Sequence, residues 1–327
     1  MIFDNYIAID WAQANIAIAR SSGLSTKISV SEYPADLELV KRYLKNLTGT
    51  TILTFEETTT SQWLYVELNE YVDKLVVCDA HYNHLLLRGP KNDKIDATKL
   101  VKHLKNDTIN EVYHSGHKFM ELRKLVSAYE DIIAEGVRVR NQRAALFRAK
   151  GMSKKSTEFS DEVNQFILGI IDRNIAIYEE NKACYRKLFE HIVKTERILS
   201  NLLSIPGIGV ISAVKIGAAV IEAHRFPTNH HFWSYCGLVM HMKHSGKKSY
   251  GKRRPKCNKS LKSVFKSAVI STIGKGKSNK FRDYYEYLIR EKNYAPYNAR
   301  HAVARKIATV TYAVMKSEKP YTPCCLR

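Results

Sequence analysis

Short apolar runs and amphipathic segments follow one another through the first eighty residues, and this pattern constrains the fold most. The runs whose alternation or apolar character predicts strands are 6–20 (two strands with a turn near residue 14), 26–33, 51–56 and 75–80. The segments with apolar side chains at helical spacing are 34–47 and 61–72. Hairpin-like strands followed by alternating strand and helix predict an α/β sheet domain with mixed strand directions.

The sequence then changes to two long helical patterns, at 117–150 and 161–203, separated by a Gly/Ser/Lys-rich break. Helices of this length usually pair as an antiparallel hairpin or form a coiled-coil dimer arm. We therefore predict three parts. They are an α/β domain at 1–115, a helical coiled-coil arm at 116–200 and a mainly α C-terminal domain at 201–327.

Charge is distributed unevenly along the chain. The 327 residues carry a net charge of +20, yet residues 1–110 hold 12 Lys+Arg against 14 Asp+Glu. Residues 241–305 hold 18 Lys+Arg against 3 Asp+Glu. A solvated basic face is the simplest account, but this density favours a polyanion partner, above all nucleic acid. Tyrosines that could stack on bases or sugars are interleaved with these cations, at Tyr250, Tyr284, Tyr285, Tyr287, Tyr294 and Tyr297.

Other features indicate where the protein works. No run of about 18 apolar residues is present, so we expect no membrane span. The first strand pattern begins almost at once and leaves no room for a signal peptide. The six cysteines form no CxxC pair, and the spacing of Cys236, His241, His244 and Cys257 fits no common zinc pattern. Reduced thiols in a cytoplasmic protein are the expectation.

A Gly-Ile-Gly turn joins two helical patterns within "SIPGIGVISA", residues 204–213. It is similar to the hairpin of helix-hairpin-helix modules, in which backbone N–H groups at the start of the second helix hold a phosphate. Gly207 and Gly209 are therefore candidate nucleic-acid contacts. A plain glycine turn is the alternative.

Four carboxylates stand out as a set. Asp10 interrupts an apolar strand, which needs a reason, and Glu56 ends a later apolar strand. Asp93 and Asp96 are three residues apart at the start of a predicted helix and so share a face. Alone, these two aspartates could simply complement the helix dipole.

In a sheet with the two strands side by side, Asp10 and Glu56 would be close, and the helix could supply the other two carboxylates. Four convergent carboxylates repel one another and are stable together only with cations. Hard oxygen ligands suit Mg²⁺ or Mn²⁺, and two such ions can act around a phosphoryl centre. The neighbouring Glu57 is a second candidate ligand, although strand alternation allows only one of Glu56 and Glu57 to join Asp10.

The ordered set Asp10, Glu56, Asp93, Asp96 resembles the DEDD tetrad of the IS110 family of insertion-sequence transposases, which are related to Piv-type DNA invertases. "KNDKIDATKL" (91–100), "SIPGIGVISA" and the segment from "FPTNHHFWSYCGL" to "HSGKKSYGKRRPKCNKSLK" resemble that family's motifs in the same order. The resemblance implies a RuvC-like first domain of the RNase H type. It also implies a recombinase whose structured non-coding guide RNA, the bridge RNA, pairs with target and donor DNA.

The same resemblance implies a nucleophilic serine, which maps to Ser245 of "HSGKK" and would form a phosphoserine intermediate with DNA. A serine hydroxyl is a poor nucleophile at neutral pH and needs a base or metal nearby. Basic residues around it could bind the phosphodiester backbone and neutralise its charge. These candidates are Lys243, Lys247, Lys248, Lys252, Arg253, Arg254, Lys256, Lys259 and Lys262.

The leading interpretation is thus a Mg²⁺-assisted (or Mn²⁺-assisted), RNA-guided DNA recombinase or transposase. Its partners would be target DNA, donor DNA, guide RNA and further copies of itself in a dimer or tetramer. The resemblance also implies a prokaryotic protein that is associated with the nucleoid. One alternative is a RuvC-like nuclease that cuts DNA with metal-activated water and leaves Ser245 a structural role. The other is a nucleic-acid-binding protein without catalysis.

Overall fold

The computed structural model describes residues 2–79, 92–153, 155–246, 248–253, 256–274, 276 and 278–323. It divides the chain into two compact units, Met1–Met120 and Glu121–Arg327. The segments 116–200 and 201–327, expected as arm and C-terminal domain, both fall almost entirely within the second unit. The division into three parts remains a prediction.

The first unit is built on a six-stranded sheet with the order β3-β2-β1-β4-β5-β6. Strand β1 runs parallel to β4, and β4 parallel to β5, whereas the β1–β2, β2–β3 and β5–β6 pairs are antiparallel. The strands are β1 (Asn5–Trp11), β2 (Asn15–Ser22), β3 (Ser29–Pro34), β4 (Thr51–Glu56), β5 (Lys74–Cys78) and β6 (Glu111–Val112). The predicted mixed α/β domain is confirmed, and its topology is consistent with a RuvC-like fold.

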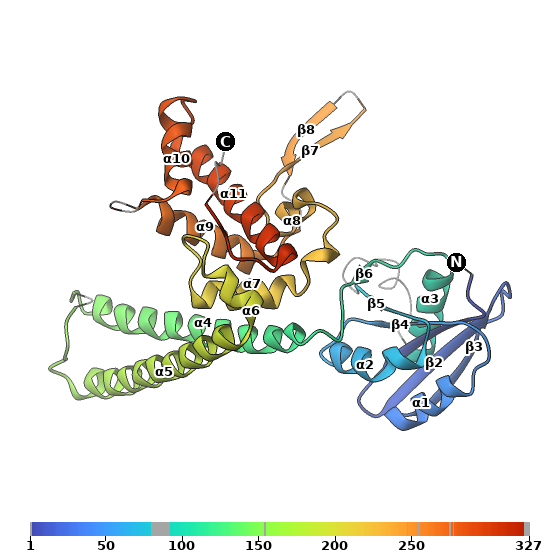
Figure 1. The fold of residues 1–327 in the computed structure, drawn as a ribbon. Coiled ribbons are helices and arrows are strands. Elements are labelled where there is room, and N and C mark those ends of the chain that lie inside the picture. Colours follow the sequence, from blue (N-terminus) through green and yellow to red (C-terminus); the bar gives the residue numbers. More distant parts are fainter. Residues whose placement is uncertain are drawn as a thin grey trace. The chain divides into compact units, whose positions relative to one another are not determined.

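Each face of this sheet is covered by helices, because strand alternation sends apolar side chains to both sides. Helices α1 (Leu37–Lys45) and α2 (Ser61–Leu68), followed by the short η1 (Asn69–Tyr71), pack on the face with the isoleucines of β1 and β2. Helix α3 (Asp93–Lys105) packs on the other face, against small side chains such as Ala8 and Ala17. Figure 1 shows α3 and the α1–α2 pair on opposite sides of the strands.

The second unit contains two long helices, α4 (Phe119–Ala149) and α5 (Glu162–Thr195), that lie side by side as an antiparallel pair (Figure 1). Contacts run in opposite order along the two helices. Tyr129 packs on Phe189 with ring centroids 5.1 Å apart, and further along α4 the Arg143 guanidinium lies 2.7 Å from the Asp172 carboxylate. The helices are therefore paired within one chain, while a coiled-coil supercoil or dimer arm remains a prediction.

The remaining helices enclose a second core around α11 (Pro296–Ser317), which buries Val303 and Ile307. The elements before it are α6 (Arg197–Leu202), α7 (Val210–Val220), η2 (Ala223–Arg225), α8 (Asn229–Tyr235), β7 (His241–Ser245), β8 (Lys248–Arg253), α9 (Lys259–Ile273) and α10 (Lys280–Arg290). The helical pattern expected to run through 161–203 is divided, because Glu196 adopts an extended backbone between α5 and α6. In the described ranges, none of the helices combines the length and the apolar character needed to cross a membrane.

Candidate active site and nucleic-acid interface

Asp10 and Glu56 lie on neighbouring parallel strands. The register pairs Ile9 of β1 with Phe55 of β4, one residue before each carboxylate. Ala8 and Ile52 face α3, and Asp10 and Glu56 are an even number of residues further along the same strands. Because side chains alternate across a sheet, both carboxylates belong to the face that α3 covers.

Helix α3 carries the other two carboxylates in its first turn. Asn92 caps this helix, since its side-chain oxygen accepts a hydrogen bond of 2.8 Å from the Lys94 backbone N–H. Further along, Ala97, Leu100 and other apolar side chains of α3 pack on the sheet. This packing fixes the start of α3, with Asp93 exposed and Asp96 half-buried.

Electrostatics link the four carboxylates. Burial, together with the negative charges of Asp93, Glu56 and Asp96, raises the pKa of Asp10 from its ordinary value of 3.8 to about 6. Complementing a helix dipole explains acidic residues at the start of α3, but it does not explain why their charges act on a strand residue. The structure thus brings together all four carboxylates that the sequence singled out.

The donor set fits a hard divalent cation. Mg²⁺ and Mn²⁺ prefer carboxylate oxygens, and a cation would relieve the repulsion that raises the pKa of Asp10. In the part of the chain that the structure describes, no three His, Cys, Asp or Glu side chains form a group tight enough to hold a metal ion. Asp10, Glu56, Asp93 and Asp96 are the residues that would hold the ion.

The choice between Glu56 and Glu57 has a structural basis. Glu56 is the last residue of β4, and its charge acts on Asp10. Glu57 follows the strand, and its backbone N–H donates a 2.9 Å hydrogen bond to the Cys78 carbonyl. The strand register therefore favours Glu56 as the fourth carboxylate.

Lys99 is a site neighbour that the sequence reasoning missed. Its Nζ lies 3.2 Å from the Asp96 Oδ1, with both side chains half-buried. The sequence spacing could have indicated this contact, because residues three apart on a helix share a face. Lys99 partly balances the negative charge of Asp96.

Ser245 lies in a β-hairpin that the sequence did not predict. It is the last residue of β7 and pairs with Lys248, the first residue of β8, across the turn at Gly246. Lys247 and Arg254 lie outside the described residues, and for Lys243, Ser245, Lys252 and Arg253 the structure describes the backbone alone. The catalytic role of Ser245 stays a prediction.

Of the other predicted nucleic-acid contacts, Lys248 begins strand β8 of this hairpin, and the rest lie before or after it. Lys248, Lys256 and Lys259 are exposed, and Lys262 is half-buried on α9. Gly207 and Gly209 line a cavity of about 470 Å³ before α7, together with Ser271, Thr272 and other residues. Gly209 is the residue that precedes α7, and no side chain caps that helix start. The backbone N–H groups at the start of α7 therefore have no side-chain cap, and phosphate binding there remains a prediction.

Comparison with protein families gives two matches. Residues 7–149 match a family model described as a DEDD transposase of the IS110 type. Residues 199–286 match the model "Transposase IS116/IS110/IS902 family". Together they span well over half of the chain, in the order that the sequence motifs predicted. No match was found among curated proteins.

Proposed function

Because the chain belongs to the IS110 family of transposases, and is therefore an enzyme that recombines DNA, we propose that it is a site-specific recombinase guided by a structured RNA. The RNA would be the non-coding bridge RNA of its element and would pair with target and donor DNA. The observation that carries the proposed catalysis is the gathering of four carboxylates, in which burial and the charges of the other three raise the pKa of Asp10.

Asp10, Glu56, Asp93 and Asp96 are proposed to hold Mg²⁺ or Mn²⁺ at the edge where β1 and β4 end. A divalent ion bound there supplies Lewis acidity at a phosphate oxygen. The protein contributes the placement, because the sheet fixes Asp10 and Glu56 and the capped start of α3 fixes the aspartates. Lys99 orients Asp96 through their ion pair.

Ser245 is proposed as the nucleophile. Its Oγ forms a bond to a phosphorus of DNA, the bond from that phosphorus to one sugar oxygen breaks, and the serine proton passes to solvent while the sugar oxygen gains one. The phosphoserine ester conserves the energy of the broken bond. A sugar hydroxyl of another strand then attacks the ester, which rejoins DNA and restores the serine. The basic residues of the hairpin and of α9 neutralise the phosphate charge.

A suicide DNA substrate tests this proposal. Wild-type protein with guide RNA should give a protein–DNA adduct that survives denaturing electrophoresis, and Ser245→Ala should give none. Ser249→Ala, in the facing strand of the same hairpin, is the matched control and should still form the adduct. An adduct that persists in Ser245→Ala would remove the serine from the mechanism and favour a water-dependent nuclease.

Omitting the RNA tests the guidance separately. We expect recombination to stop without the RNA and to move to a new sequence when the guide segment is changed. Recombination at an unchanged site without RNA would show that the protein alone selects the DNA. A homo-oligomer, dimer or tetramer, is part of the proposal because two DNA duplexes must be cut and exchanged together.

A further inference from the structure

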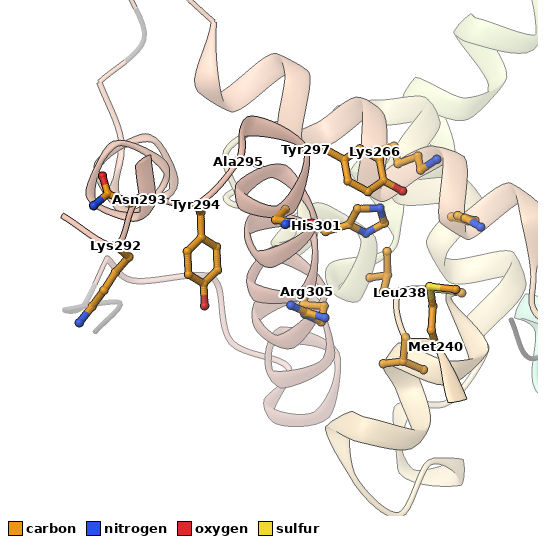
Figure 2. A pocket seen from close by; sticks show the side chains of 14 residues that line it. Leu238, Met240, Lys266, Lys292, Asn293, Tyr294, Ala295, Tyr297, His301 and Arg305 are labelled. Atoms are coloured by element: carbon orange, nitrogen blue, oxygen red, sulfur yellow. The ribbon is translucent and has the colours of Figure 1, made fainter. Parts of the chain in front are cut away.

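A basic groove in the second unit contains, besides Lys262 and Lys266 of α9, aromatic and basic residues that the chemistry proposed above does not use. Its volume is about 720 Å³, and its walls come from residues 237–240, from α9, from the loop before α11 and from α11 itself (Figure 2). None of the described residues that line it is acidic. Its cations include Lys262, Lys266, Lys292 and Arg305. A groove with this charge balance selects an anion.

The cations are available to a ligand. Lys266 and Arg305 have no carboxylate partner in the described part of the chain. Arg305 follows Tyr297 and His301 at intervals of four residues, so the three lie along one face of α11. Figure 2 shows this row and Lys266 on the neighbouring helix. Two aromatic rings and a guanidinium therefore follow one another along one wall.

Two tyrosines present aromatic rings at the groove. Tyr297 is 61% exposed and Tyr294 is 46% exposed, although both line a cavity. The Tyr297 ring meets the His301 ring edge-on, with centroids 4.7 Å apart. A large exposed ring that is already held by a neighbour offers a flat face for stacking at low entropic cost.

The loop that carries Tyr294 is fixed by its backbone. Asn293 has a φ of 50°, a left-handed conformation that asparagine tolerates better than most residues. The Tyr294 N–H then donates a 2.9 Å hydrogen bond to the Leu288 carbonyl at the end of α10. Pro296 starts α11 directly afterwards. Both tyrosines are thereby placed before any ligand binds.

We propose that this groove binds an unpaired nucleotide segment, with bases stacked on Tyr297 and Tyr294 and phosphates held by Lys266 and Arg305. The volume suits a nucleotide and is far too small for a duplex. Aromatic rings between cations are how proteins hold single strands with little sequence preference. The inference rests on the proposed function only in that the enzyme handles nucleic acid, and it is independent of the serine chemistry.

Fluorescence anisotropy with the full-length protein tests the groove, using labelled oligo(dT) and oligo(U) strands of about twelve nucleotides. Tyr297→Ala should weaken binding roughly 10-fold, whereas Tyr297→Phe, which keeps the ring, should bind as wild type. Lys266→Ala should lower the slope of log affinity against log salt by about 0.7. Lys124→Ala is the matched control, since Lys124 lies outside both the groove and residues 241–305 and pairs with Glu121, and it should change neither quantity.

The tighter of the two strands identifies the ligand as DNA or RNA, and either supports the groove. Three results would overturn the inference, because charge alone would then explain binding. In the first, Tyr297→Ala binds the single strands with wild-type affinity, and in the second, it loses as much affinity for duplex DNA as for the single strands. In the third, polyglutamate competes with the labelled strand as well as an unlabelled strand does. If the wild-type protein binds strands as described but fails to recombine DNA with its guide RNA, the proposed function fails and the groove stands.

Discussion

Replacing Asp10 by asparagine should stabilise the metal-free first unit at neutral pH. Burial and the charges of Asp93, Glu56 and Asp96 raise the pKa of Asp10 to about 6, above its ordinary value of 3.8. Above pH 7 the carboxylate is charged in both the folded and the unfolded chain, so folding bears the full cost of burying and crowding that charge. Asparagine has nearly the same shape and no charge.

The expected gain in the free energy of unfolding follows from the pKa of Asp10. A rise from 3.8 to about 6 corresponds to about 3 kcal/mol, at about 1.4 kcal/mol for each pKa unit. Because water reaches part of the carboxyl group and screens the charges, we expect a gain of about 1–3 kcal/mol. Below pH 6, Asp10 of the folded wild type takes up a proton before Asp10 of the unfolded chain does. The free-energy cost of burying the charged carboxylate therefore shrinks. The difference between the two proteins should vanish near pH 4.

Urea unfolding followed by tryptophan fluorescence measures this difference. Trp11 and Trp63 lie in the first unit with ring centroids 5.5 Å apart, so a Trp233→Phe background reports on that unit alone. Measurements in EDTA from pH 4 to pH 8 give the metal-free curve, and added Mg²⁺ should stabilise only the protein with Asp10. Asp131→Asn, an exposed position on α4, is the control. If Asp10→Asn is no more stable than wild type at pH 8, the carboxylates are not gathered as described.

Two further results are expected. Affinity for DNA should fall steeply with salt, by about 0.9 in the log–log slope for each phosphate contacted, and a flat filter-binding titration would exclude residues 241–305 as the polyanion site. Gly207→Ala should destabilise the second unit by about 1–3 kcal/mol in thermal melts, because Gly207 has a φ of +88° and a Cβ would lie 2.5 Å from the Ala268 carbonyl oxygen. Gly209→Ala, where a Cβ meets open space, should cost much less, and equal losses at the two glycines would contradict this account.

The sheet domain and its carboxylates could be predicted because their signals are local. Apolar alternation marks each strand, and Asp10 is conspicuous as a charge within one of them. Strand register then favours Glu56 over Glu57, a choice that the carboxylates' spacing in the sequence left open, and the metal-ligand role stays a prediction.

The second unit was harder to predict for physical reasons. The β7–β8 hairpin consists largely of polar residues and lacks the apolar alternation that marks a half-buried strand. Helix α5 ends at Thr195, where the sequence has no glycine or proline that would predict the end of a helix. The basic groove joins residues 237–240 to α11, and such proximity arises only from tertiary packing.

A plasmid recombination assay of paired variants tests the central claim, that the four gathered carboxylates form the catalytic centre. With guide RNA and Mg²⁺ present, Glu56→Gln, Asp93→Asn and Asp96→Asn should each abolish recombination while the melting temperature and RNA binding stay close to wild type. Glu57→Gln, one residue beyond the strand, should recombine DNA normally. Full activity in Glu56→Gln or Asp96→Asn would contradict the account, as would a loss in Glu57→Gln that equals the loss in Glu56→Gln.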